Sequence, residues 1–168
     1  MSNNLEFTLA DWSNPSDCST VVALLQAYAL HPMGGAQPLS DYSARNLPEA
    51  MSATPGAFSV IGWHADDDGN RRAVALANCF TTLSTFACKP LVNVHDLYVD
   101  DAARGQGTGQ ATLGFVEQEA RSRGCCKVTL EVLTGNANAI KSYEQFGFLP
   151  YKLDDKTGHA LFMHKTLS

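Results

Sequence analysis

The feature of this sequence that most restricts its fold is a glycine-rich junction between an expected strand and an expected helix. Apolar, β-branched and aromatic residues predict a strand at 91–99, and helical apolar spacing predicts a helix from Gly107 to Arg123. Between them, Arg-Gly-Gln-Gly-Thr-Gly at 104–109 lets the main chain turn closely and presents its amide groups. Such a junction at a helix N-terminus favours the binding of an anion such as phosphate.

The spacing of these glycines excludes two common phosphate-binding motifs. A dinucleotide-binding G-x-G-x-x-G would require glycine at Gln110 or at Thr112, and a Walker A loop would require a following G-K-[ST]. What remains is the pattern R-x-x-G-x-G, formed by Arg104, Gly107 and Gly109. Taken alone, this junction is compatible with a packing role as well as with phosphate binding.

The order of the other expected elements indicates the fold class. It is strand, one or two helices, three strands, helix, strand, helix and strand, which predicts an α/β domain with a mixed sheet and helices on both faces. With 168 residues, we expect a single domain spanning 1–168. The expected strands are 5–10, 57–64, 71–82, 91–99, 127–133 and 160–165. The expected helices begin at Pro15, Asp41, Gly107 and Asn136, and the last of them ends at Phe146.

Charge and hydropathy narrow the classes of partner. The chain has 12 basic and 17 acidic residues, a formal net charge of -5, without a basic run, which argues against nucleic acid and favours a cationic small molecule. The longest nearly apolar run, 21–30, is too short for the roughly 20 residues of a membrane span. Because the first basic residue is Arg45, neither an export signal nor a transit peptide is expected.

The cysteines and histidines predict no metal site. Five cysteines are scattered along the chain without a C-x-x-C pair, so neither a zinc site nor a disulfide framework is expected. We expect reduced thiols and a cytoplasmic location.

A second pattern lies further along the chain, on the expected short helix. It reads N-x-x-A-x-x-x-Y-x-x-x-G-F from Asn136 to Phe148. Together with the [QR]-x-x-G-x-[GA] loop at 104–109, it resembles the GCN5-related N-acetyltransferase (GNAT) family, whose element order this chain matches over nearly its whole length. Thr108 and Thr112 stand where this family commonly has aliphatic residues, which concerns the packing of the helix rather than phosphate binding.

The resemblance implies a mostly antiparallel central sheet with one splayed parallel strand pair, 91–99 and 127–133, and acetyl-coenzyme A bound where the two strands part. The main chain of Leu97 and Val99 would pair with the pantetheine arm, and amides from Gly105 to Gln110 would hold the pyrophosphate. Asn136 would contact the pantetheine, and Tyr143 would direct its hydroxyl at the sulfur. The residues implied to bind the cosubstrate are Leu97, Tyr98, Val99, Arg104, Gly105, Gln106, Gly107, Thr108, Gly109, Gln110, Asn136, Ala139 and Tyr143.

Direct transfer of an acetyl group to an amine requires a base for the amine and a proton for the departing thiolate. Tyr143, a weakly acidic donor, suits the second role. His95 is the first candidate for the base, because imidazole exchanges protons near neutral pH and because serotonin- and polyamine-acetylating relatives place a His or Glu there. Asp96 is the second candidate, as a base through water or as a carboxylate that attracts a cationic substrate.

Strict alternation along the expected strand places the two base candidates on opposite faces of the sheet. Residues two apart share a face, so His95 should lie with Leu97, and Asp96 with Tyr98. The complete predicted sets are Asn93, His95, Leu97 and Val99 on one face and Val92, Val94, Asp96 and Tyr98 on the other.

These observations predict an amine N-acetyltransferase for a small molecule. The family varies its acceptor-binding wall at positions that correspond to 30–54, and Met33, Tyr42 and Ser84 are expected to line it. Polyamine, amino acid, aminoglycoside-like drug and protein N-terminus remain open as acceptors. The alternatives are a non-catalytic acyl-coenzyme A sensor or interaction module of the same fold, and a nucleotide-binding domain without acyl chemistry. Because relatives frequently pair, a homodimer is the default expectation.

Overall fold

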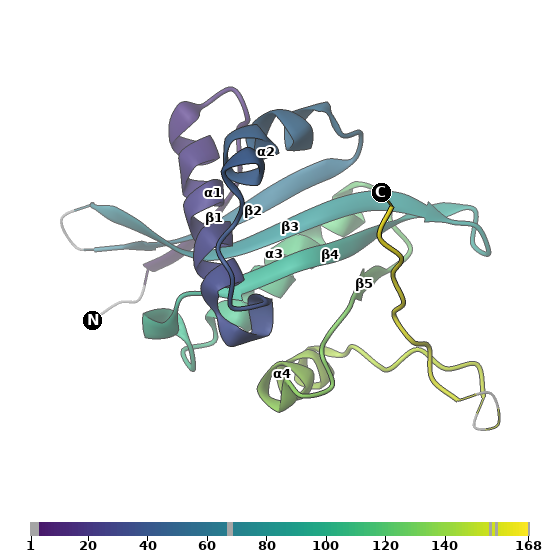
Figure 1. Cartoon of the computed structure of the whole chain (residues 1–168). Helices are drawn as coiled ribbons and strands as arrows, with labels where there is room; N and C mark the ends of the chain where they lie inside the picture. The colour runs from purple at the N-terminus through teal and green to yellow at the C-terminus, as the bar shows by residue number, and fades with distance from the viewer. Residues whose placement is uncertain (1–3, 67–68, 155, 157, 168) are drawn as a thin grey trace. The chain divides into compact units, whose positions relative to one another are not determined.

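The computed structural model describes residues 4–66, 69–154, 156 and 158–167 (Figure 1). The chain divides into two compact units, Met1–Leu130 and Glu131–Ser168. The first unit holds the sheet and three α-helices, and the second holds one α-helix. One domain spanning 1–168 therefore stays a prediction.

The sheet of the first unit has the predicted mixed, mostly antiparallel character. Its order is β1-β2-β3-β4-β5, in which the first four strands pair antiparallel and β5 pairs parallel with β4. Hairpins join β2 to β3 and β3 to β4, as expected for antiparallel neighbours in the chain. The strands are β1 (Asn4–Leu9), β2 (Ala57–Ala65), β3 (Arg71–Ser84), β4 (Lys89–Val99) and β5 (Val128–Leu130).

The helices begin at the capping residues that the sequence supplies. In α1 (Pro15–Leu30), the side chain of Asn14 accepts a hydrogen bond from the N–H of Ser16. In α2 (Asp41–Ala53), Ser40 accepts from the N–H of Ser43. The helix α3 (Thr108–Ser122) follows the glycine-rich loop, and the 3₁₀ turns η1 (Pro32–Gly34) and η2 (Asp101–Ala103) precede α2 and α3.

Two apolar clusters cover the two faces of the sheet, which confirms helices on both faces. In Figure 1, α1 and α2 lie on one face of the sheet and α3 on the other. The α1-side cluster consists of Val21, Leu24, Ile61, Leu76 and Tyr98. The α3-side cluster consists of Phe58, Val60, Ala77, Cys79, Val92, Val94, Val116 and Ala120.

A β-bulge in β4 overturns the predicted alternation of its side chains. Cys79 of β3 pairs with Val94, and the preceding Asn78 pairs with Asp96, so His95 is one extra residue in β4. An extra residue reverses the in-and-out order beyond it. Leu97 accordingly packs on the α3-side cluster, with Val94, although Asp96 and Tyr98 were predicted to share the face of Val94.

The parallel pair is confirmed, but β5 is shorter than predicted. Its ladder with β4 runs from Val92 and Val128 to Val94 and Leu130, whereas the sequence predicted a strand at 127–133. The ladder ends where the bulge begins, and β4 continues to Val99.

The second unit confirms the predicted short helix and contradicts the predicted last strand. In α4 (Ala137–Phe146), Asn136 caps the first turn, and Gly147, with φ 110°, ends the helix. Between 160 and 165 the described backbone has no strand, and the one bridge nearby joins Lys152 to His159. Residues of high strand propensity form a strand only where a partner ladder is available, which the sequence alone does not reveal.

Candidate active site

The glycine-rich loop takes a conformation that favours glycine at two positions. Gly105 and Gly107 have φ values of 73° and 83°, in the left-handed region that side chains disfavour. A β-carbon added at either position would meet no atom within 4 Å. The need for glycine here is therefore conformational, and the space beside the loop is open.

The loop presents the N-terminus of α3 without a side-chain cap. Gly107 is the cap residue, and the N–H of Ala111 bonds to the carbonyl oxygen of Gly107 at 2.9 Å. The amides of Thr108 and Gly109 precede that bond, so they are among the N–H groups that no helix satisfies internally. Amides in this position, with the positive end of the helix dipole, suit a phosphate group.

The two threonines at aliphatic positions of the family pattern are accommodated by internal hydrogen bonds. The hydroxyl of buried Thr108 donates to the carbonyl of Ala103 at 2.9 Å. That of buried Thr112 donates to the carbonyl of Thr108 at 2.8 Å. Both polar atoms are satisfied, so the substitutions do not disturb the packing of α3.

Arg104 ties the loop to its surroundings. Its Nε donates to the carbonyl oxygen of Val99 at 2.9 Å. Its Nη1 lies 2.7 Å from Oδ1 of Asp101 and 3.1 Å from Nε2 of His31. Because Asp101 already offsets this positive charge, the main-chain amides and the α3 dipole are the stronger attraction for an anion.

The end of β4 offers main-chain groups on the side away from β3. From Asp96 to Val99 it pairs with β3, whereas its pairing with β5 stops at Val94. No strand in the described part of the chain continues that ladder. An extended ligand can pair with such an edge as a further strand would.

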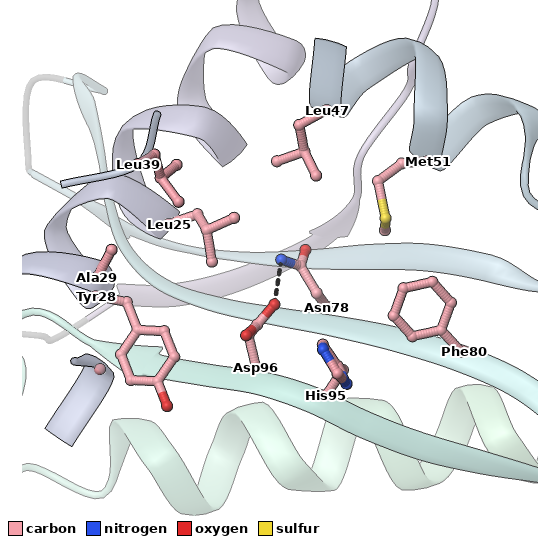
Figure 2. A pocket seen from close by; sticks show the side chains of 11 residues that line it. Leu25, Tyr28, Ala29, Leu39, Leu47, Met51, Asn78, Phe80, His95 and Asp96 are labelled. Atoms are coloured by element: carbon pink, nitrogen blue, oxygen red, sulfur yellow. Dashed lines mark hydrogen bonds between the residues drawn. The ribbon is translucent and has the colours of Figure 1, made fainter. Parts of the chain in front are cut away.

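A pocket of about 360 Å³ opens on the α1 face of the sheet (Figure 2). Its volume falls within the range of roughly 300–1,000 Å³ typical of small-molecule sites. The lining is apolar or aromatic except for three polar residues on β3 and β4. The lining residues are Leu25, Tyr28, Ala29, Gly34, Leu39, Leu47, Met51, Asn78, Phe80, His95 and Asp96.

The bulge brings both candidate bases to this one pocket. His95 is exposed, and its ring packs edge to face with that of Phe80, with ring centroids 5.6 Å apart. Asp96 is partly buried and accepts a hydrogen bond from Nδ2 of Asn78 at 3.0 Å. Without the bulge, these consecutive residues would point to opposite faces.

A buried polar chain holds Asp96 in place. The hydroxyl of Ser59 donates to Oδ1 of Asn78 at 2.5 Å, and Asn78 in turn donates to Asp96. Ser59 and Asn78 are 0% and 2% exposed, so this chain crosses the sheet from β2 to β4 away from water. Asn78 is not among the predicted site residues, although a lone Asn within the apolar run 73–80 is a signal for such a role.

The negative charge of Asp96 acts on its neighbours. Burial and then the Asp96 carboxylate raise the pKa of Tyr28, which lines the same pocket. Burial, chiefly, raises the pKa of the Cys79 thiol to about 12. Both groups are therefore protonated near neutral pH.

The sequence model of the Acetyltransferase (GNAT) family matches residues 22–148. The chain belongs to this family. Acetyltransferase Atu2258 of Agrobacterium fabrum is 40% identical over 52 residues, 31% of this chain and 36% of the relative. Mycothiol acetyltransferase of Beutenbergia cavernae is 29% identical over 133 residues, 79% of this chain and 41% of the relative. The chain thus spans less than half the length of each of these two relatives.

A solved structure supports the same assignment of the fold. The acetyltransferase of Trypanosoma brucei matches with a TM-score of 0.67 and 25% identity, over 98% of this chain and 100% of that protein. The predicted GNAT family and its mixed sheet are therefore confirmed. Both motifs, 104–109 and 136–148, fall within the matched residues.

The pocket of this GNAT chain takes part of its lining from the segment 30–54 that is expected to form the acceptor wall. Neither Met33, Tyr42 nor Ser84 lines the pocket, whereas Leu47 and Met51 do. Leu47 and Met51 lie one turn apart on α2 and face the sheet, so Tyr42 falls on the outer side and is 74% exposed.

The residues predicted on the second motif lie in the second unit. Oδ1 of Asn136 accepts from the N–H of Ala139 at 3.2 Å, so the side chain of Asn136 caps α4. The ring of Tyr143 contacts Phe148 edge to face, with centroids 6.0 Å apart. The roles of Asn136, Ala139 and Tyr143 toward the cosubstrate stay predictions.

The described residues contain neither a cluster of metal ligands nor a membrane-spanning helix. No group of three His, Cys, Asp or Glu side chains among the described residues could hold a metal ion. None of the helices in the described ranges has the length and hydropathy to cross a bilayer.

Proposed function

We propose that this chain is an N-acetyltransferase that moves the acetyl group of acetyl-coenzyme A to the primary amine of a small cationic molecule. One observation carries the proposal. The bulge in β4 turns His95 and Asp96 into one pocket, on the strand whose end leads into the glycine-rich loop. A proton acceptor, a carboxylate and an anion-binding turn are thus offered by one strand and the loop that follows it.

The residues present fit acetyl-coenzyme A as a cosubstrate. Amides between Gly105 and Gln110 would bind its diphosphate, because the N-terminus of α3 has no side-chain cap and the loop is open. The main chain at Leu97–Val99 would pair with its extended arm. Arg104 would hold the loop in shape through Val99 and Asp101.

The transfer needs no covalent bond to the protein. Acetyl-coenzyme A supplies the acetyl group as a thioester. The ammonium of the acceptor gives one proton to His95, or to Asp96 through water, and the neutral nitrogen then bonds to the acetyl carbon as the carbon–sulfur bond breaks. The sulfur keeps the electron pair of that bond and takes a proton from Tyr143, while the nitrogen releases its second proton to solvent, which reprotonates Tyr143. The net products are the amide, the free thiol and one proton.

Turnover separates this proposal from the alternative of a non-catalytic sensor. The full chain is incubated with acetyl-coenzyme A and a panel of primary amines, and both the free thiol and the acetylated amine are measured. We expect both to appear in equal amounts. A chain that binds the thioester and returns it unchanged with every amine is a sensor, and one stabilised by NAD or ATP rather than by coenzyme A is a nucleotide-binding domain.

His95→Ala should lower turnover by about 100- to 10,000-fold, the usual contribution of a general base, and leave thermal stabilisation by coenzyme A unchanged. Tyr143→Phe should also lower turnover with unchanged coenzyme A affinity. The control is His164→Ala, because His164 is exposed and lies outside the pocket. Full activity of His95→Ala across the pH range would remove His95 from the mechanism.

The expected setting of the protein belongs to the same proposal. All five cysteines are free, in keeping with a reducing compartment such as the cytoplasm. The homodimer stays a prediction, which the mass of the full chain in solution checks.

A further inference from the structure

We propose that the acceptor is a monoamine with an apolar body, an aryl-alkyl or branched alkyl chain, whose single ammonium group pairs with Asp96. This inference rests on the proposed function and names the substrate class of the same pocket. It excludes polyamines and amino sugars as preferred acceptors. The two parts of the pocket that select this class are the carboxylate on β4 and the apolar wall above it.

The pocket can pair one positive charge of a ligand. Among the residues that line it, Asp96 is the only carboxylate. A polyamine would bring further ammonium groups that find no second carboxylate. Placing unpaired charge against apolar side chains is costly, so a second charge would be rejected.

The carboxylate of Asp96 is held in a defined position. One oxygen of Asp96 accepts from Asn78, which is itself held by Ser59. Figure 2 shows the second oxygen of Asp96 on the side of Tyr28, toward the space bounded by α1. A carboxylate with one oxygen fixed and the other facing the pocket offers a defined position for one ammonium group.

The wall opposite Asp96 is apolar. Leu25 of α1 and Leu47 and Met51 of α2 point into the space above β3 and β4 (Figure 2). Leu39 completes the wall, and its N–H is tied to Oε1 of Gln26 on α1 at 3.0 Å. These side chains offer almost no hydrogen bonds to the hydroxyl groups of an amino sugar, whereas an apolar body gains by leaving water.

The same arrangement separates the two candidate bases. With Asp96 paired to the ammonium group, His95 at the exposed side of the pocket is the group that accepts its proton. Asp96 then keeps its charge throughout the transfer, and the proton on His95 passes to solvent after the amide forms. Asp96 is therefore a binding residue in this proposal.

The experiment compares acceptors that all carry a primary amine but differ in the polarity and charge of the rest of the molecule. With the full chain, kcat/KM is measured for two apolar amines, 2-phenylethylamine and 3-methylbutylamine, and for two polar ones, spermidine and glucosamine. We expect the apolar pair to exceed the polar pair by at least about 10-fold, a preference of the size that apolar pocket contacts give. Calorimetric binding of the same amines examines the pocket independently of turnover.

Two variants of α2 form a matched pair. Leu47→Asp adds a second carboxylate inside the pocket and should shift the kcat/KM ratio toward spermidine by about 10-fold or more. Tyr42→Asp adds the same charge on the exposed side of the helix and should leave the ratio unchanged. If Leu47→Asp does not fold, Met51→Glu places a carboxylate in the same wall and carries the same expectation. Asp96→Asn should raise the Michaelis constant for the aryl-alkyl amine and weaken its calorimetric binding, without affecting coenzyme A.

The outcomes distinguish this inference from the proposed function. Binding of the aryl-alkyl amine that depends on Asp96, without acetyl transfer to any amine, overturns the function and supports only the amine class that the pocket selects. Acetyl transfer that prefers spermidine or glucosamine overturns the inference and leaves the function intact. An equal shift in Leu47→Asp and Tyr42→Asp also overturns it, because general attraction would then explain the preference. The absence of both amine binding and acetyl transfer overturns both.

Discussion

The glycine-rich loop and the pocket are built in opposite ways. The loop, 104–109, consists of consecutive residues, and it offers a ligand its main-chain groups. The pocket collects side chains from α1, α2, β3 and β4, which are far apart in the sequence. The proposed cosubstrate end therefore depends on backbone conformation, whereas the proposed acceptor end depends on how separate elements pack.

The two regions should consequently fail in different ways. A change in the loop should act on coenzyme A and spare the amine, because amide positions depend on φ at Gly105 and Gly107. A change in the polar chain under the pocket should act on the amine and spare coenzyme A. The three predictions that follow measure this separation.

The largest effect is expected from Gly107→Val. A β-branched residue at φ 83° carries about 1–3 kcal/mol of strain, and relief of that strain would move the first amides of α3. We expect coenzyme A affinity to fall by about 10- to 100-fold in calorimetry. The control is Gly114→Ala in the exposed middle of α3, which should stabilise the helix by about 0.5–1 kcal/mol and leave coenzyme A binding unchanged. Equal binding by wild type and Gly107→Val would contradict the role of the loop.

The next effect is expected from Asn78→Leu, which removes the link between Ser59 and Asp96. Leaving buried Ser59 without its partner should lower the free energy of unfolding by about 1–3 kcal/mol. The KM of the amine should rise several-fold while coenzyme A affinity stays constant. Cys79→Ala is the control, because Cys79 is equally buried but packs on the α3 face. Cys79→Ala should lower the free energy of unfolding without changing the KM of the amine. A similar KM in both variants would contradict the role of the polar chain in holding Asp96.

The smallest effect is expected from Arg104→Gln. Its guanidinium is already paired with Asp101, and partly exposed ion pairs contribute only about 0–1 kcal/mol. Coenzyme A affinity should fall less than about 5-fold, with little change in its dependence on salt concentration. A loss larger than that of Gly107→Val, together with a weaker salt dependence, would show that Arg104 binds the phosphates directly.

Much of the fold could be predicted because its signals are local. Asn14 and Ser40 cap helices, Gly107 and Gly147 take left-handed conformations at helix ends, and apolar spacing indicates which helix faces are buried. The glycine-rich loop is local in the same sense. The family could be predicted for this reason, since both of its motifs are short and continuous.

The pocket could not be predicted because it depends on pairing between distant residues. The bulge at His95 exists only in the register of β4 against β3, so alternation within β4 alone gave the wrong faces for Leu97 and Asp96. Asn78 gained its role from contacts with Ser59 and Asp96, on two other strands. The strand predicted at 160–165 failed for a related reason, since strand propensity does not supply a partner.

The most direct test is a crystal structure of the full chain with coenzyme A. We predict diphosphate oxygens within hydrogen-bond distance of main-chain N–H groups between residues 105 and 110, and the pantetheine arm paired with β4 at 97–99. A diphosphate bound elsewhere, or a β5 that pairs with β4 as far as Val99 and leaves no edge for the arm, would contradict this mode of binding.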